Sequence, residues 1–213
     1  MTLTTLPSIV TVASERPDVG GGPDHPMRRV TADTAFAPES WTRERAAKVG
    51  ELFDSLAPTW KERDGPERHA SVLDALDRGG PFPSGACIEV GSGAGVATPV
   101  LVAGLHDVIA LDLSFGMLEL ADSEAPRVRA DSSVLPIRSH AVAVVALINM
   151  FLFPNEVDRV LANDGVVLWV STLGDATPIY LPPEDVLRAL PGAWDGIAAD
   201  AGWGNWLVAR RAN

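Results

Sequence analysis

The sequence predicts an α/β protein with a doubly wound, largely parallel sheet and helices on both of its faces. Strand-like and helical segments alternate five times after residue 85, and one strand-like segment, residues 141–148, is apolar throughout. Alternation of this kind is typical of a parallel sheet, and a strand buried on both faces forms a continuous apolar run. Two further segments between Trp194 and Arg211 predict a C-terminal antiparallel hairpin, so we expect seven strands in all.

Residues 1–40 are expected to form a disordered arm, because they contain five prolines, three consecutive glycines and little periodicity. Order is expected to begin at Ser40, a plausible helix N-cap. Apolar residues at helical spacing then predict a helix that Pro58 ends, and a second helix should span 67–78. Residues 41–213 are therefore expected to form a single domain, with N-terminal helices over 41–80 and the sheet over 85–213.

The elements of the sheet core follow from short apolar segments that are bounded by turn residues. We expect parallel strands over residues 86–90, 108–111, 127–130, 141–148 and 166–171. We expect helices from the glycine-rich turn to 101, from an N-cap at Ser114 to 121, over 156–162 and over 183–190. Residues 200–202 should form the turn of the hairpin.

Composition and charge exclude several classes of protein. Hydrophobic residues make up 46% of the chain and charged residues 21%, as in a soluble globular protein. Acids exceed bases by 28 − 17 = 11, and a surface of that sign repels the phosphate backbone of a nucleic acid. Cys87 is the only cysteine, so no internal disulfide can form. With no apolar stretch long enough to span a bilayer, we expect a cytoplasmic protein without nucleic-acid or membrane partners.

The glycine-rich turn after the first parallel strand is the most informative segment of the sequence. Residues 88–95 read IEVGSGAG, with an acid, Glu89, two places before the first of three glycines. Such a turn between a strand and a helix lets the backbone approach a ligand closely. The dinucleotide pattern G-x-G-x-x-G would require glycine at position 96, where this chain has Val96. A nicotinamide-dependent oxidoreductase is therefore the less favoured alternative.

Two further acids stand at the ends of the next strands. Asp112 ends the second strand, 112 − 91 = 21 residues after the first glycine, and Asp131 ends the third. A carboxylate in the position of Asp112 can accept two hydrogen bonds from ribose hydroxyls. Together with Glu89 and the glycines, these acids resemble motif I and the following strand ends of the class I S-adenosylmethionine (SAM)-dependent methyltransferases.

The resemblance implies a Rossmann-like fold and a set of cofactor-binding residues. It implies that Glu89 contacts the methionine part of SAM, that Asp112 binds the ribose and that Asp131 receives the adenine amino group. Leu113 and Met117 are placed to sandwich the adenine. The full set is Glu89, Gly91, Ser92, Gly93, Gly95, Asp112, Leu113, Met117, Asp131, Ser132, Asn149 and Trp60.

Other segments resemble the small-molecule, ubiquinone/menaquinone C-methyltransferase-like (type 11) branch. Residues 131–149 resemble its "acid, LP, apolar fourth strand" passage. Residues 156–166 resemble E-x-x-R-V-L-x-x-G-G, with Val166 in place of the second glycine. Residues 52–60 resemble F-D-x-x-A-x-x-Y, with Trp60 in place of the final tyrosine. The resemblance implies a helical lid over the cofactor that includes Trp60.

The implied activity is in-line transfer of a methyl group from SAM to an O, C or N atom of a small molecule. This reaction needs no metal, and a general base helps only where the acceptor must lose a proton. We assign no catalytic residue, so a SAM-binding domain without catalysis remains an alternative. Substrate selectivity is expected from the N-terminal helices and residues 172–183, which include Asp175, Thr177 and Tyr180.

Overall fold

The structure, a computed structural model, describes residues 1–20 and 22–212. Within these residues all strands belong to one sheet. The strands are β1 (Thr2–Thr5), β2 (Cys87–Val90), β3 (Val108–Asp112), β4 (Arg127–Arg129), β5 (Val142–Ile148), β6 (Leu161–Ser171), β7 (Trp194–Ala201) and β8 (Gly204–Arg211). Their order is β1-β7-β8-β6-β5-β2-β3-β4, and β8 is the strand that runs antiparallel to its neighbours β6 and β7.

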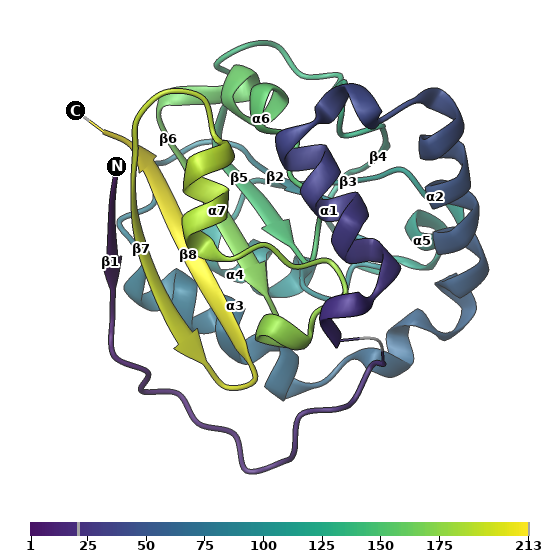
Figure 1. Cartoon of the computed structure of the whole chain (residues 1–213), viewed down its shortest axis with the longest axis horizontal. Helices are drawn as coiled ribbons and strands as arrows, with labels where there is room; N and C mark the ends of the chain where they lie inside the picture. Colours follow the sequence, from purple (N-terminus) through teal and green to yellow (C-terminus); the bar gives the residue numbers. More distant parts are fainter. Residues whose placement is uncertain (21, 213) are drawn as a thin grey trace.

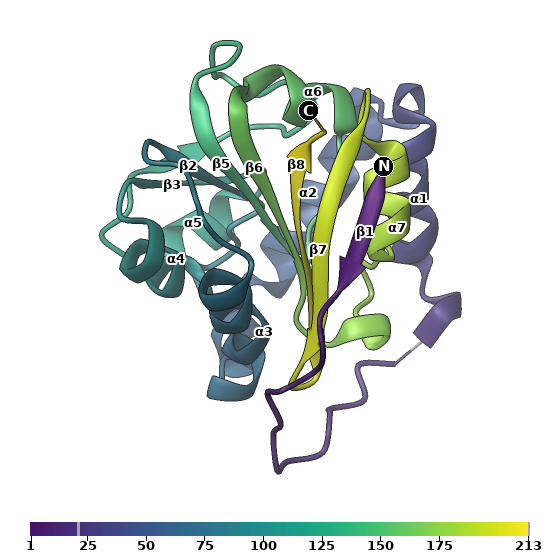
Figure 2. The ribbon, with the colours of Figure 1, turned by 90° about the vertical axis from the view of Figure 1, so that its left-hand side faces the viewer.

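Helices cover both faces of this sheet. They are α1 (Pro26–Phe36), α2 (Arg43–Leu56), α3 (Pro66–Arg78), α4 (Thr98–Leu105), α5 (Phe115–Leu120), α6 (Pro154–Val160) and α7 (Pro183–Ala189). Figure 2 shows α3 and α4 on one face and α1 and α7 on the other. Each face has its own apolar core, with Val72 and Leu101 in one and Val157 and Leu187 in the other. The predicted doubly wound fold with a C-terminal hairpin is confirmed.

The first predicted helix begins later than expected. Helix α2 starts at Arg43, and the hydroxyl of Thr42, not that of Ser40, accepts the capping hydrogen bond from the backbone N–H of Arg45. Ser40 instead ends a short 3-10 turn, and its hydroxyl accepts from the Arg45 side chain. The predicted cap at Ser114 is confirmed, because its hydroxyl accepts from the backbone N–H of Met117.

The N-terminal segment contains regular structure where the sequence predicts a disordered arm. Strand β1 pairs in parallel with β7 and makes the sheet eight strands wide instead of seven. The chain then follows the edge of the hairpin, where Leu6 donates to the carbonyl of Ala198 and Gly202 donates to that of Val10 (Figure 1). The edge of β7 offers unpaired backbone groups, and pairing with them orders a segment whose own composition favours disorder.

A buried carboxylate fastens α3 to the sheet. Asp74 is 4% exposed, and its side chain accepts from the indole N–H of Trp206 on β8 at 2.6 Å and from Arg78 at 2.7 Å. The pair of donors compensates for the cost of burying this charge. The described part of the chain contains no helix with the length and apolarity needed to cross a bilayer.

We predict that Asp74→Ala lowers the free energy of unfolding by about 3 kcal/mol, because it leaves the Trp206 N–H and the Arg78 guanidinium without their acceptor. Urea unfolding monitored by circular dichroism measures the change. Asp77→Ala, on an exposed position of the same helix, is the matched control and should change the stability by less than about 0.5 kcal/mol. Equal effects of the two substitutions would contradict this role of Asp74.

Candidate functional site

The carboxyl ends of β2, β3 and β5 lie at one edge of the sheet. Strand β2 is parallel to both neighbours, with Val90 in register with Leu111 on β3 and with Leu147 on β5. The segments that follow these strands therefore emerge side by side. In a doubly wound sheet this edge is where ligands bind.

The turn after β2 adopts a conformation that requires its glycines. Gly91, Gly93 and Gly95 have φ angles of +73°, +57° and +76°. These angles lie in the left-handed region that side chains disfavour. The backbone N–H groups of Gly91 and Ser92 both donate to the carbonyl of Leu111, at 2.8 and 2.9 Å. The hydroxyl of Ser92 is buried without a hydrogen-bond partner in the described structure.

The Asp112 carboxylate connects this turn to the next helix. Its Oδ2 accepts from the backbone N–H of Gly93 and its Oδ1 accepts from that of Ser114, both at 2.8 Å. Burial raises the pKa of Asp112, and these backbone hydrogen bonds oppose the increase. Each carboxylate oxygen has a second lone pair. Asp112 can therefore accept further hydrogen bonds from a ligand.

The carboxylate of Asp54, near the end of α2, supports the same region. Its Oδ1 accepts from the hydroxyl of Ser114 and from the backbone N–H of Gly116. These hydrogen bonds hold the pKa of Asp54 below its usual value. Helix α2 is thereby attached to the first turn of α5, so it covers the strand ends.

Glu89 lies beneath the glycine-rich turn rather than on its surface. The side chain is 2% exposed, and its Oε2 accepts from the Thr98 hydroxyl at 2.5 Å. Burial, together with the nearby charge of Asp112, raises the pKa of Glu89 to about 8, although the Thr98 hydrogen bond opposes this. With its pKa raised in this way, Glu89 favours the protonated form at neutral pH.

Asp131 lines a cavity of about 440 Å³ between the loops after the strands and α2. Leu113 also lines this cavity, together with Ala46 of α2 and Trp41, which lies just before α2. The indole N–H of Trp41 lies 3.1 and 3.2 Å from the two carboxylate oxygens of Asp131. Trp41 is not among the site residues that the sequence predicts, because 90 residues separate it from Asp131 and it lies in no recognisable motif.

Met117 and Ser132, two of the predicted site residues, do not line this cavity. Met117 is 1% exposed and packs with Ala57 and Ala94, so it does not line the cavity beside Leu113. Ser132 is largely buried, and its neighbour Ser133 both lines the cavity and donates its N–H to Asp131 at 2.8 Å.

The amide of Asn149 is also engaged within the protein. Its Oδ1 accepts from the backbone N–H of Thr172 at 2.8 Å, and its Nδ2 donates to the Thr172 hydroxyl at 2.9 Å. Asn149 itself has a φ of +51°. This residue connects the ends of β5 and β6, whereas the sequence analysis places it among the cofactor-binding residues.

The side chains of Met150 and Trp60 cover the glycine-rich turn. A Cβ atom at Gly91 would overlap the sulfur of Met150, and one at Gly93 would meet Nε1 of Trp60 at 3.2 Å. Trp60 also packs edge-on against Phe53, with ring centroids 5.7 Å apart. The predicted position of Trp60 beside the turn agrees with this arrangement, whereas Met150 has no sequence signal beyond its place after β5.

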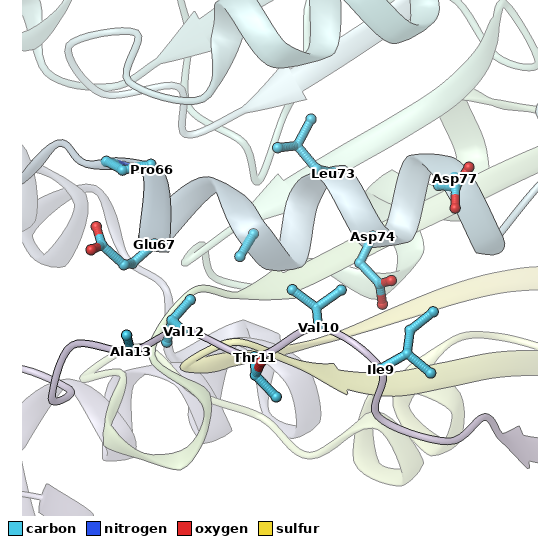
Figure 3. Close-up of a pocket in the computed structure, with 11 residues that line it drawn as sticks. Ile9, Val10, Thr11, Val12, Ala13, Pro66, Glu67, Leu73, Asp74 and Asp77 are labelled. Carbon is cyan, nitrogen blue, oxygen red and sulfur yellow. The ribbon is translucent and has the colours of Figure 1, made fainter.

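A second cavity, of about 530 Å³, lies away from this edge. It separates residues 9–13 from α3, and none of the predicted site residues lines it (Figure 3). Within the part of the chain that the structure describes, no group of three His, Cys, Asp or Glu side chains is arranged to hold a metal ion.

Comparison with known proteins agrees with this geometry. Residues 88–168 match the model of a family described as a methyltransferase domain. This range begins in β2 and includes the glycine-rich turn, Asp112, Asp131 and Asn149. No curated protein matches the sequence significantly.

Solved structures share the fold at low sequence identity. The complex of DhpI with SAH has a TM-score of 0.60 and 18% identity, over 76% of this chain and 94% of that one. A SAM-dependent methyltransferase from Aquifex aeolicus has a TM-score of 0.58 and 17% identity, over 72% and 97%. A putative methyltransferase of Haloferax volcanii, in complex with the activator Trm112, has a TM-score of 0.50 and 20% identity, over 57% of this chain and 59% of that one. At these identities the likeness shows the fold.

We predict that Glu89→Gln stabilises the protein increasingly as the pH rises from about 4.5 to about 8. In this window the unfolded Glu89 is ionised and the folded one is protonated, so wild-type stability falls by up to about 1.4 kcal/mol per pH unit. Urea unfolding of both proteins at pH 5, 6.5 and 8 measures the difference. The exposed Glu62→Gln is the control. If the stability difference between Glu89→Gln and wild type is the same at every pH, the pKa of Glu89 is not raised in the folded protein.

Proposed function

We propose that this chain is a class I SAM-dependent methyltransferase, an enzyme that transfers the methyl group of SAM to a small-molecule acceptor. The co-substrate SAM carries a methyl group made electrophilic by the positive charge on its sulfur. The observation that supports the proposal most is the placement of the glycine-rich turn, Asp112 and Asp131 along one edge of the sheet, next to a cavity. We propose one methyltransferase domain over residues 41–213, covered in part by the N-terminal segment.

The cavity beside α2 fits the adenosine part of SAM. Asp112 has free lone pairs for the ribose hydroxyls, and Leu113 supplies an apolar surface for the adenine ring. Asp131 can accept from the adenine amino group through the lone pairs that Trp41 and Ser133 leave free. The indole of Trp41 offers an aromatic face at the same cavity.

The glycine-rich turn fits the methionine part once one side chain moves. Met150 lies on Gly91 and occupies the space next to it, and a methionine side chain reorients at small cost because it is unbranched and flexible. The buried Ser92 hydroxyl, which has no partner within the described residues, is available to a ligand at this point. In this proposal Glu89 holds the turn from below through Thr98 and does not itself touch the ligand.

The residues around the turn would act mainly by positioning and by excluding water. Trp60 and Phe53 form an aromatic wall over Gly93, and Phe151 and Phe153 extend it beyond Met150. A site without bulk water favours a reaction in which positive charge disappears. The carboxylates of Asp54 and Asp112 give the site the sign that attracts a cationic co-substrate.

A small molecule is the acceptor class that the surroundings support. The strand ends beyond Met150 are covered by apolar side chains of α1, α2 and the loop that contains Ile179. The excess of 11 acids over bases argues against a nucleic-acid acceptor. Formation of S-adenosylhomocysteine in a screen of small acceptors would distinguish this enzyme from a SAM-binding domain without catalysis.

We predict that Asp112→Ala weakens the binding of S-adenosylhomocysteine by about 1–3 kcal/mol, because it removes charged hydrogen bonds to the ribose and releases Gly93 and Ser114. Isothermal titration calorimetry measures the affinity. Asp112→Asn, which keeps the shape of the side chain, should show a smaller loss in the same direction.

The control for this experiment is Asp107→Ala. Asp107 is exposed and precedes β3 at the opposite edge of the sheet, so its removal should leave the affinity unchanged. An Asp112→Ala protein that is folded and binds as tightly as wild type would place the cofactor elsewhere.

A further inference from the structure

Arg28 at the start of α1 is a partly buried cation without a carboxylate partner. Its guanidinium lies over the ring of Tyr180, with Cζ 4.8 Å from the centroid, and it donates to the backbone carbonyl of Asp175. Among residues 1–20 and 22–212, no carboxylate oxygen lies within 4.0 Å of it. The nearby carboxylate of Asp175 is instead paired with Arg16, at 2.8 Å.

Three polar atoms in this neighbourhood are buried and have no hydrogen-bond partner within the described structure. They are Nε of Arg28, Oγ of Ser171 and Oδ1 of Asn205. Ser171 ends β6 and is in register with Asn205 on β8, so their side chains lie on the same face of the sheet. Asn205 in turn donates to the hydroxyl of Tyr180 at 3.3 Å. We call these four residues, Arg28, Ser171, Tyr180 and Asn205, the Arg28 cluster.

Such a cluster is costly unless a ligand completes it. A buried polar atom without a partner costs about 1–3 kcal/mol, and a buried charge costs more. Burial lowers the pKa of Arg28, in keeping with this cost. The chain has 11 more acids than bases, yet none of the described acids pairs with Arg28. The missing counter-charge is therefore expected from outside the chain.

The cluster lies next to the proposed site of methyl transfer. Met27 and Ile179, the sequence neighbours of Arg28 and Tyr180, pack in the same apolar group as Met150. Met150 in turn covers Gly91 in the glycine-rich turn. The same apolar group thus lies next to the turn and next to the Arg28 cluster, at the edge where the carboxyl ends of β2, β5 and β6 emerge.

We infer that the methyl acceptor carries a carboxylate, which binds to the guanidinium of Arg28, on an apolar body that lies against Met27, Met150 and Ile179. This inference rests on the proposed function. Nε and an adjacent Nη of an arginine form a planar fork that matches the two oxygens of a carboxylate. One arginine without a partner matches one negative charge, and the Ser171 hydroxyl supplies a further donor deeper in the cluster. Arg28 is thus a specificity-determining residue.

The test compares the binding of matched acids and amides to the full-length protein. The probes are 4-hydroxybenzoate with 4-hydroxybenzamide and phenylacetate with phenylacetamide, titrated with and without saturating S-adenosylhomocysteine and followed by ligand-observed NMR. The wild type should bind each acid at least about tenfold more tightly than its amide. In Arg28→Gln the ratio should fall to about one. Arg29→Gln, at the exposed neighbouring position, should keep the wild-type ratio.

The outcomes separate this inference from the proposed function. Equal binding of acid and amide by the wild type, an acid preference that persists in Arg28→Gln, or no binding of either acid would overturn the inference. Arg28→Gln should bind S-adenosylhomocysteine as wild type does, which also shows that the variant is folded. If the wild type does not bind S-adenosylhomocysteine, the proposed function is overturned. The comparison of acids with amides would still show whether Arg28 binds a carboxylate.

Discussion

The arrangement of the candidate site depends on the two hydrogen bonds that Asp112 accepts from backbone N–H groups. One comes from Gly93 in the turn after β2 and the other from Ser114 at the start of α5. This carboxylate therefore fixes two loops that belong to different strands. Asp54 repeats the pattern one step outward, since it binds Ser114 and Gly116 and so attaches α2 to α5. The covering helices and the sheet are thus joined through carboxylates.

The strands and the glycine-rich turn were predictable because their signals are local. A fully apolar segment over residues 141–148 indicates a central strand, and glycines at alternate positions after a strand indicate a turn with positive φ. The contacts that the sequence did not predict join residues far apart in the chain. Trp41 meets Asp131, Asn149 meets Thr172, and β1 pairs with β7, each decided by tertiary packing. Local composition cannot report such pairings, which is why residues 1–40 were expected to be disordered.

The N-terminal segment makes more contacts with the loop after β6 than its composition suggests. Arg16 donates to the carbonyl of Leu173 and pairs with Asp175, and Arg28 reaches the same loop from α1. These contacts hold residues 172–183, the segment from which we expect substrate selectivity. In the proposed site the cofactor side is formed by the sheet and α2, whereas the proposed acceptor side is formed by the N-terminal segment and the loop after β6.

The central claim is that the edge formed by the glycine-rich turn, Asp112 and Asp131 binds SAM. Calorimetric titration of the wild-type protein with S-adenosylhomocysteine, run beside an identical titration with NADH, tests it most directly. The account predicts saturable binding of one S-adenosylhomocysteine per chain and no binding of NADH. Saturable binding of NADH without binding of S-adenosylhomocysteine would contradict it, and the turn would then be a dinucleotide site despite Val96.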